Sequence, residues 1–321
     1  KEKSLEDFFI NRFGKELYLT FFKDYTEKVW GVKCCDIPPE WGSQRVKGVS
    51  ITKVLKEALK KVFKKRDTNH KKVETSLIEG FVYPKYGAGQ MYTEIANLAV
   101  EKGVKLNLNH KVINILFKNG VISGVRVKNL KTNKISEVYG DIVISCMAIK
   151  ELMDIMEIQH PKEIKEISDG LVYRDYLTVG LLLDEMKLKN KTQFKSINNI
   201  IPDNWIYIQE RDVKIGRLDI FNNFSVYMLN DINKIWLGAE YFCTVGDEIW
   251  SKNDKEIADF AISELEKIDL IRSTDVIDKV VFRVEKAYPA YFGTYNKFDR
   301  LIDYINKFEN LFLIGRNGMH K

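Results

Sequence analysis

The stretch Leu311-Phe312-Leu313-Ile314-Gly315-Arg316-Asn317-Gly318 decides the fold class of this chain of 321 residues. It is an apolar strand that runs into a glycine-rich turn. Glycine lets the backbone approach a ligand closely, and such a turn presents N–H groups to a phosphate or to an electron-poor ring. The stretch therefore predicts the last strand of an α/β cofactor domain.

Two parts of such a domain are not found in the sequence. A helix normally follows the glycine-rich turn, yet the sequence ends three residues after Gly318. No Gly-x-Gly-x-x-Gly fingerprint follows an early strand anywhere in the chain. We therefore expect a cofactor domain that lacks its first nucleotide-binding unit and its final helix.

Composition excludes several classes of protein. The chain is 45% hydrophobic, which is sufficient for a large core, and its length suggests about two domains. The net charge of +6 is concentrated in residues 53–72, and the near-neutral remainder argues against a nucleic-acid partner. No apolar run approaches the ~20 residues of a membrane-spanning helix. The cysteines have no metal-ligand spacing, which favours a reduced, cytoplasmic protein without a metal site.

The basic segment has two interpretations. Residues 53–72 contain nine Lys or Arg and two acidic residues, and residues 51–63 are strongly amphipathic. Such a segment is most often a solvated helix face followed by a loop. The alternative is contact with an anionic substrate or an anionic membrane surface, which would place the protein peripherally at the inner face of a membrane.

Hydrophobic patterns divide the chain between two domains. Residues 81–148 and 286–321 resemble pieces of the cofactor domain, and residues 1–80 and 149–285 resemble a substrate domain. The pattern predicts strands at residues 81–83, 104–108, 112–117, 121–127, 136–139, 141–145, 177–183, 205–209, 224–229, 235–242 and 276–285. It predicts helices at residues 90–102, 254–267 and 297–308, and a helical cap that begins with a capping box at Ser4. The fold class is thus mixed α/β and α+β, with antiparallel sheet in the substrate domain.

Two aromatic or glycine-rich segments could contact a ligand. Residues 83–90 place Gly87 and Gly89 at a predicted helix N-terminus, where the backbone could approach an anion. An ordinary strand–turn–helix connection is the plainer explanation. Trp30 is either a core anchor or an aromatic wall for a ring-shaped ligand.

Two charged residues are also candidates. Arg217 is either a surface arginine or a cation aimed at a planar or phosphate group. Glu240 lies in the apolar run 236–242, so its carboxylate must be paired or must have a raised pKa. An ion pair with an arginine is the structural alternative to a role in the site. No nucleophile motif lies near a histidine, so triad hydrolysis has no support.

Ordered segments across the whole chain resemble the FAD-dependent protoporphyrinogen-oxidase-like and amine-oxidase-like oxidoreductases. Many of these enzymes are encoded among polysaccharide-biosynthesis genes. The matching segments are residues 4–14, 25–31, 41–45, 83–91, 204–209, 216–217, 240–243, 288–291 and 313–320. The UDP-galactopyranose mutase family is similar in the Tyr-Thr-Glu-Lys-x-Trp-Gly segment at residues 25–31 and in the Gly-Arg-x-Gly turn at residues 315–318.

This resemblance implies a two-domain FAD-binding flavoprotein fold with FAD as the cofactor. The cofactor contacts that it implies are Val112, Ser145, Gly315, Arg316, Asn317 and Gly318. In the mutase family the tryptophan region lines the nucleotide-sugar site, which makes Trp30 a substrate-side candidate. The remaining substrate-side candidates are Tyr83, Gly87, Gly89, Gln90, Arg217, Glu240, Tyr288 and Tyr291. No proton-transfer base is assigned.

Three functions follow as hypotheses. The first is an FAD-dependent oxidoreductase of cell-surface polysaccharide biosynthesis, inactive without the absent parts of its cofactor domain, that acts on a small molecule. The second is a flavin-dependent sugar-nucleotide isomerase similar to the mutase. The third is a degenerate relative that only binds a partner, against which the preserved Gly-Arg-Asn-Gly turn argues. No feature indicates an oligomeric state.

Overall fold

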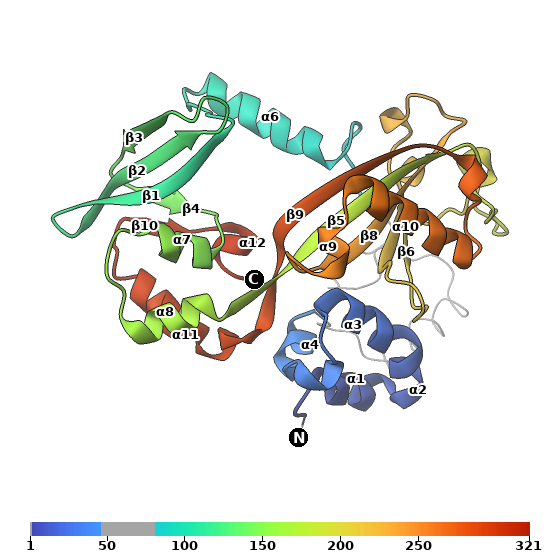
Figure 1. The fold of residues 1–321 in the computed structure, drawn as a ribbon, viewed down its shortest axis with the longest axis horizontal. Helices are drawn as coiled ribbons and strands as arrows, with labels where there is room; N and C mark the ends of the chain where they lie inside the picture. The colour runs from blue at the N-terminus through green and yellow to red at the C-terminus, as the bar shows by residue number, and fades with distance from the viewer. Residues whose placement is uncertain (1, 46–80) are drawn as a thin grey trace, which may run out of the picture. The chain divides into compact units, whose positions relative to one another are not determined.

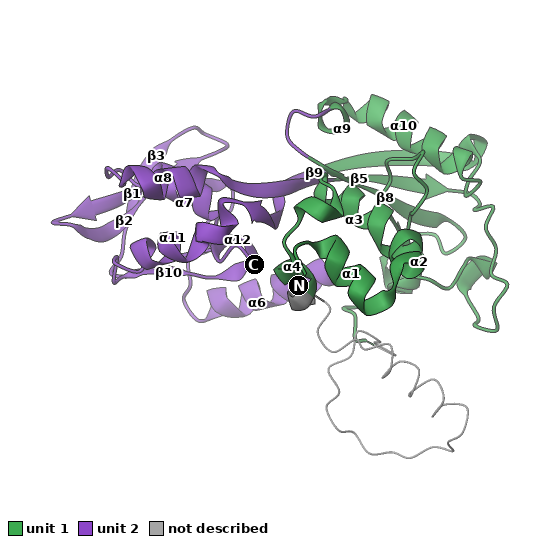
Figure 2. Ribbon diagram, turned by 90° about the horizontal axis from the view of Figure 1, so that it is seen from below, with its two compact units in different colours: residues 1–87, 177–243, 248–282 green, residues 88–176, 244–247, 283–321 purple. Residues whose placement is uncertain are grey.

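The computed structural model describes residues 2–45 and 81–321 (Figure 1). The chain divides into two compact units, which Figure 2 shows in different colours. Unit 1 comprises Lys1–Gly87, Leu177–Cys243 and Glu248–Phe282, and unit 2 comprises Ala88–Tyr176, Thr244–Asp247 and Arg283–Lys321. Helices and strands occur in both units, as the mixed fold class predicts.

Unit 1 begins with a group of short helices. They are α1 (Leu5–Phe13), α2 (Lys15–Leu17), the π-helical turn η1 (Tyr18–Phe22), α3 (Lys23–Trp30), η2 (Cys34–Asp36) and α4 (Pro39–Arg45). The predicted capping box is confirmed, because the Ser4 hydroxyl accepts from the Asp7 N–H and the Asp7 carboxylate accepts from the Ser4 N–H, both at 3.2 Å. Leu5, Phe8 and Phe9 then turn one face of α1 into the core.

A five-stranded sheet forms the centre of unit 1, and two of its strands also contribute residues to unit 2. The strand order is β6 (Trp205–Tyr207), β7 (Arg217–Ile220), β8 (Ile235–Cys243), β5 (Leu171–Leu183) and β9 (Val276–Gly293). Strands β6, β7 and β8 are antiparallel. One face of the sheet packs against α10 (Asp254–Lys267), which together with α9 (Glu248–Ser251) follows β8. This core contains Leu218, Leu237, Tyr241, Ile257, Ala261 and Leu265.

Unit 2 combines an antiparallel meander with a short parallel pair. The meander consists of β1 (His110–Lys118), β2 (Val121–Asn129) and β3 (Ile135–Tyr139), and the parallel pair is β4 (Val143–Ser145) with β10 (Leu311–Leu313). Its helices are α6 (Ala88–Glu101), α7 (Ile149–Ile155), α8 (Lys162–Asp169), α11 (Phe298–Ile305) and α12 (Gly315–Gly318). Helices α7, α8 and α11 pack against strand β10 through Ile149, Leu152, Ile167, Leu301, Ile305 and Leu311.

Several predicted strands are wrong. Residues 81–83 and 104–108 form no strand, and residues 224–229 contain a short 3-10 turn, η5 (Val226–Met228), instead of a ladder. The aromatic residues that suggested strands pack with one another: the ring centroid of Phe224 lies 5.2 Å from those of Tyr83 and Trp205. The aromatic side chains of these segments therefore pack against one another, although the pattern assigned the segments to a sheet.

Two further expectations differ from the structure. A strand is present at Val143–Ser145 within the predicted strand 141–145. An apolar run of this kind is usually buried, yet Ile142 and Ile144 are 62% and 61% exposed, and only Ser145 is buried. The compact units have other bounds than the predicted domains, because residues 149–176 lie in unit 2, where α7 and α8 pack, and residues 81–87 lie in unit 1. The assignment of a substrate domain and a cofactor domain stays a prediction. The amphipathic and basic segments at residues 51–63 and 53–72 lie outside the described residues.

Candidate functional site

The predicted cofactor residues gather in unit 2. Strand β10 pairs in parallel with β4, which places Leu313 beside Ser145. The Ile314 N–H then donates to the Ser145 carbonyl at 2.9 Å. The turn at residues 315–318 therefore begins directly beside the end of β4.

The two glycines of this turn are required for different reasons. Gly315 has φ of +74°, a left-handed conformation that side-chain-bearing residues rarely adopt. Gly318 is buried, and a Cβ atom there would lie 2.7 Å from the Ser145 carbonyl oxygen and 3.1 Å from the Cys146 Cα. The spacing of the glycines thus holds the turn against the last residues of β4.

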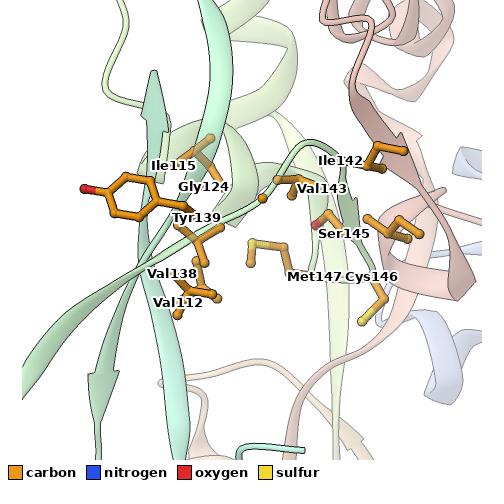
Figure 3. A pocket seen from close by; sticks show the side chains of 13 residues that line it. Val112, Ile115, Gly124, Val138, Tyr139, Ile142, Val143, Ser145, Cys146 and Met147 are labelled. Atoms are coloured by element: carbon orange, nitrogen blue, oxygen red, sulfur yellow. The ribbon is translucent and has the colours of Figure 1, made fainter. Parts of the chain in front are cut away.

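An apolar pocket of about 430 Å³ lies between the meander and β4. It is lined by Val112, Ile115, Gly124, Val125, Val138, Tyr139, Gly140, Ile142, Val143, Ile144, Ser145, Cys146 and Met147. Figure 3 shows Val112 and Val138 together on one side, with Ser145 and Met147 on the other. Two predicted cofactor contacts, Val112 and Ser145, therefore line the same pocket.

Two buried polar atoms, one in β4 and one in the turn at residues 315–318, lack hydrogen-bond partners among the described residues. They are the Ser145 hydroxyl and the Asn317 side-chain oxygen. Buried polar groups in folded proteins are normally hydrogen-bonded, so such atoms suggest a ligand or a water. An apolar pocket bordered by a few polar atoms is typical of sites for planar ring systems. The chemistry of these residues is compatible with contact to part of an FAD molecule.

Arg316 is held by the segment of β9 that lies beside the turn. Its guanidinium carbon lies 5.4 Å from the ring centroid of Tyr288, and one of its nitrogens donates to the Ala287 carbonyl at 3.5 Å. Buried Asp175 fixes the backbone before this segment by accepting the N–H of Lys286 at 2.7 Å. Lys286 has φ of +52°, so this hydrogen bond holds an unusual bend in the strand.

The turn is anchored at its end by His320. This residue is fully buried, and its Nε2 lies 2.9 Å from the Ala290 carbonyl. Burial lowers the pKa of the imidazole, so it is neutral at physiological pH.

Tyr291 is also buried, with its ring centroid 4.9 Å from that of Tyr295. The substrate-side role of Tyr291 stays a prediction.

In unit 1 a second group of polar residues shares one face of the sheet. Arg217 pairs directly with Glu240 and Tyr207, and Asp219 pairs with Trp205. Directly paired and alternate residues point to the same side of a sheet. Arg217, Asp219, Glu240, Trp205 and Tyr207 therefore lie on one face, opposite the core with α10.

The charges on this face are tightly coupled. The Arg217 guanidinium donates two hydrogen bonds to the Glu240 carboxylate, one from Nε to Oε2 and one from Nη2 to Oε1 at 2.9 Å. Glu240 and Asp219 are 2% and 6% exposed. Burial, and then the hydrogen bond with Glu240, raise the pKa of Asp219 to about 8. One arginine thus neutralises one carboxylate, and Asp219 holds a proton at neutral pH.

The raised pKa of Asp219 predicts that the stability of the fold depends on pH. Because the folded state raises the pKa of Asp219, its contribution to stability is complete at low pH and is lost as the pH rises toward 8. Asp219→Asn keeps a neutral partner that cannot titrate. The free energy of unfolding of the wild type should therefore fall relative to the variant with rising pH, by up to about 1.4 kcal/mol per pH unit. Urea unfolding across this range measures the difference, and parallel profiles would contradict it.

Aromatic rings surround the polar face. Trp205 and Tyr207 are 44% and 52% exposed, and the rings of Tyr25 and Tyr207 meet edge to face at 4.7 Å. Tyr83, a predicted substrate contact, packs against Phe224, whose ring also contacts Trp205. Exposed aromatic rings beside fixed polar groups can stack on a planar or sugar ring.

The segment at residues 25–31 has structural roles. The Lys28 ammonium donates to the carbonyls of Ile208, Glu210 and Ile215 at 3.0, 2.7 and 3.0 Å, which clamps α3 to the loop beyond β6. Trp30 is 4% exposed and contacts Trp41 edge to face at 5.7 Å. This packing matches the core-anchor interpretation of Trp30, and its role toward a substrate stays a prediction.

The other substrate-side candidates are distributed over the two units. Gly87 belongs to unit 1 and has φ of +93°, directly before α6, whereas Gly89, Gln90 and Tyr288 belong to unit 2. The structure brings Arg217 and Glu240 together within unit 1. The pairing alternative for Glu240 is thus what the structure shows, and its role toward a substrate stays a prediction.

Asp219, Trp205 and Tyr207 were missed as members of this face. No strand was assigned to residues 217–220, because the alternation of polar Arg217 and Asp219 with Leu218 and Ile220 covers only four residues. A period-2 reading of this short segment would have placed Asp219 on the same face as Arg217, and the pairing of Arg217 with Glu240 then adds Glu240 to that face.

Two classes of site are not found in the described parts. Residues 2–45 and 81–321 contain no group of three or more histidine, cysteine or acidic side chains that could hold a metal. None of the helices in these ranges is long and apolar enough to cross a membrane.

Comparison with known proteins shows the fold. No protein-family model matches the chain, and no curated protein matches it. A solved structure of reduced UDP-galactopyranose mutase superposes with a TM-score of 0.71 at 20% identity, over 99% of this chain and 63% of the mutase. A protoporphyrinogen-oxidase-like protein from Exiguobacterium sp. gives 0.64 at 14% identity, over 99% of this chain and 64% of that protein. An oxidoreductase from Methanosarcina mazei superposes with a TM-score of 0.54 at 12% identity, over 91% of this chain and 57% of that protein.

The chain has the FAD-binding flavoprotein fold. The resemblance stated from the sequence is thereby confirmed at the level of the fold. The chain spans less than two thirds of the length of each of these three solved relatives. Which reaction it serves is therefore a separate question.

Proposed function

We propose that this chain forms the substrate domain and part of the cofactor domain of an FAD-dependent oxidoreductase, similar to amine oxidases and protoporphyrinogen oxidases. The observation that carries the proposal is the arrangement in unit 2. Val112 and Ser145 line one apolar pocket, and the turn at residues 315–318 packs against the end of the same strand. A cytoplasmic role in cell-surface polysaccharide biosynthesis, on a small-molecule substrate, is part of this proposal.

The residues of unit 2 have distinct tasks toward the cofactor. Bound FAD would supply the oxidation or reduction itself. The Ser145 hydroxyl and the Asn317 side-chain oxygen would hydrogen-bond it, which satisfies two buried atoms. Arg316 adds a positive charge, and Tyr288 restricts the guanidinium by lying 5.4 Å from it. A cation fixed in advance stabilises negative charge that develops on a reduced cofactor.

FAD titration of the full chain tests this assignment. Arg316→Met should weaken FAD binding several-fold, because it removes the cation and leaves the glycines of the turn in place. Arg300→Met is the matched control, because Arg300 is an exposed arginine of α11 that pairs with Glu163. Quenching of flavin fluorescence measures both. Equal affinity for the two variants, or no FAD binding by the wild type, would overturn the proposed role of the turn.

A flavin-dependent isomerase of nucleotide sugars is the second candidate. It is supported by the superposition on the mutase over nearly the whole chain and by the shared segment at residues 25–31. Exposed Trp205 and Tyr207 beside the Arg217–Glu240 pair would suit a sugar or nucleobase ring. Incubation with FAD and UDP-galactose separates the two candidates. Furanose formed only with reduced flavin supports the isomerase, whereas flavin-dependent oxidation of a substrate without furanose supports the oxidoreductase.

A further inference from the structure

Asp175 of β5 is a buried carboxylate with two backbone partners. It is 4% exposed, and it belongs to unit 2 together with both partners. One carboxylate oxygen accepts the Val245 N–H at 2.6 Å, and the other accepts the Lys286 N–H at 2.7 Å. A carboxylate that accepts backbone N–H groups forms strong, charge-assisted hydrogen bonds. Asp175 therefore joins β5 to the turn that follows β8 and to a point within β9.

The turn that follows β8 is closed by contacts of its own. The Asp247 carboxylate accepts the Thr244 N–H at 2.7 Å, and the Thr244 carbonyl accepts the Asp247 N–H at 2.9 Å. The Arg174 guanidinium donates to the Thr244 hydroxyl at 2.6 Å. One oxygen of Asp175 thus contacts a turn that is held independently, and the other oxygen can restrain β9.

The restrained point in β9 lies directly before the residues that contact the arginine of the flavin turn. Lys286 has φ of +52°, a conformation that is uncommon for a residue with a side chain and that needs support from its surroundings. The Ala287 carbonyl accepts from Arg316 at 3.5 Å, and the Tyr288 ring centroid lies 5.4 Å from the guanidinium carbon. A distance of 3.5 Å is near the limit of a hydrogen bond, so a small shift of the bend would remove this contact.

The same segment of β9 is also held by its neighbours. The ring centroid of Tyr288 lies 6.3 Å from that of Tyr176, which follows Asp175 in β5, and the two rings meet edge to face. At the other end of the segment, the buried His320 contacts the Ala290 carbonyl. His320 follows the flavin turn, so its contact moves with the turn. Asp175 is in a different strand, so its contact holds the segment from outside the turn.

We propose that Asp175 is a positioning residue for the Arg316 guanidinium. It fixes the bend at Lys286, and the bend places the Ala287 carbonyl and the Tyr288 ring against the guanidinium. This inference rests on the proposed function, because the cation that Asp175 positions is the one assigned to the flavin.

The charge of Asp175 and its positioning role predict opposite effects on FAD binding. FAD is an anion through its diphosphate, so removal of a negative charge from unit 2 would by itself strengthen binding. Asp175→Asn removes that charge, and its amide has only one oxygen to accept the two N–H groups. Loss of the bend would release the guanidinium and weaken binding. The direction of the change therefore shows which role Asp175 has.

FAD titration of single and double variants of the full chain tests the proposal. Asp175→Asn should raise the Kd for FAD about fivefold or more. In an Arg316→Met background the same substitution should raise it by less than about twofold, because the residue through which Asp175 acts is absent. Tighter binding by Asp175→Asn, or equal weakening in both backgrounds, would overturn the proposal while leaving the flavin site in place. A wild type that binds no FAD would overturn the proposed function itself.

Glu264→Gln is the matched control for loss of a buried carboxylate. Glu264 is 5% exposed in unit 1, and its two oxygens accept the backbone N–H groups of Lys214 and Ile215. This variant should lose stability as Asp175→Asn does, yet it should bind FAD as the wild type does. FAD binding weakened equally by the two variants would show general destabilisation and would overturn the positioning role.

A measurement without the cofactor tests the arrangement of Arg316 directly. The NMR signals of the Arg316 side chain, assigned by their loss in Arg316→Met, report its place against the Tyr288 ring. Asp175→Asn should move these signals toward those of Arg300, whose side chain is 60% exposed, and Glu264→Gln should leave them unchanged. Arg316 signals that are the same in Asp175→Asn and the wild type would overturn the proposal.

Discussion

Arg217→Met is expected to lower the free energy of unfolding by about 3–5 kcal/mol. Arg217 neutralises Glu240, which is 2% exposed and lies beside Asp219 at 6% exposed. Without the guanidinium, the Glu240 carboxylate would lose its bidentate ion pair and would have to stay ionised or take up a proton beside the protonated Asp219 in an apolar setting. Urea unfolding of the wild type and the variant measures this difference.

Two further variants determine whether burial is the cause. Arg211→Met breaks the ion pair between Arg211 and Asp24, in which the arginine side chain is 70% exposed. This variant should change the free energy of unfolding by no more than about 1 kcal/mol. The double variant Arg217→Met with Glu240→Met replaces both charges by apolar groups. It should recover much of the loss, because the uncompensated carboxylate is removed as well. A loss for Arg217→Met as small as that for Arg211→Met would contradict the buried coupling.

Gly318→Val should lower the free energy of unfolding by about 1–3 kcal/mol and should also weaken FAD binding. A Cβ atom at this position would meet the Ser145 carbonyl at 2.7 Å, and backbone atoms cannot move aside as a flexible side chain can. The turn would therefore shift away from the end of β4. This end of the strand contains Ser145, which lines the pocket. Thermal unfolding and flavin fluorescence measure the two effects.

Gly89→Ala is the matched control for this variant. A Cβ atom at Gly89 would have no neighbour within 4 Å, and the residue lies in the first turn of α6. Alanine favours helix over glycine by up to about 1 kcal/mol, so this variant should be neutral or slightly more stable. A Gly318→Val protein as stable as Gly89→Ala would show that the turn is not pressed against β4.

Local signals in the sequence were sufficient for α6, α10, α11 and the start of the helical cap, and for the meander, whereas α7 and α8 were not predicted. Helix α10 begins and ends where the pattern of residues 254–267 predicts, because a capping box precedes it and apolar residues recur on one face. The Asn119-Gly120 dipeptide likewise predicts the turn between β1 and β2, where both residues have positive φ. Such features depend on neighbours in sequence, which makes them readable without a structure.

Features that depend on distant residues were not predictable in the same way. The apolar residues of 224–229 suggest a strand, yet the ring of Phe224 is used by Tyr83 and Trp205, which are far away in sequence. Asp219 was missed because its importance arises from Glu240 on the next strand. The exposure of Ile144 was not predicted either, because an apolar run by itself indicates a buried strand.

The most direct test of the flavin site is a hydrogen-exchange map of the full chain with and without FAD. The account predicts that FAD slows exchange at Val112, Ser145 and residues 315–318 of unit 2, and that Arg316→Met reduces this protection. Protection elsewhere, with these amides unchanged, would contradict the assignment of the cofactor site to unit 2.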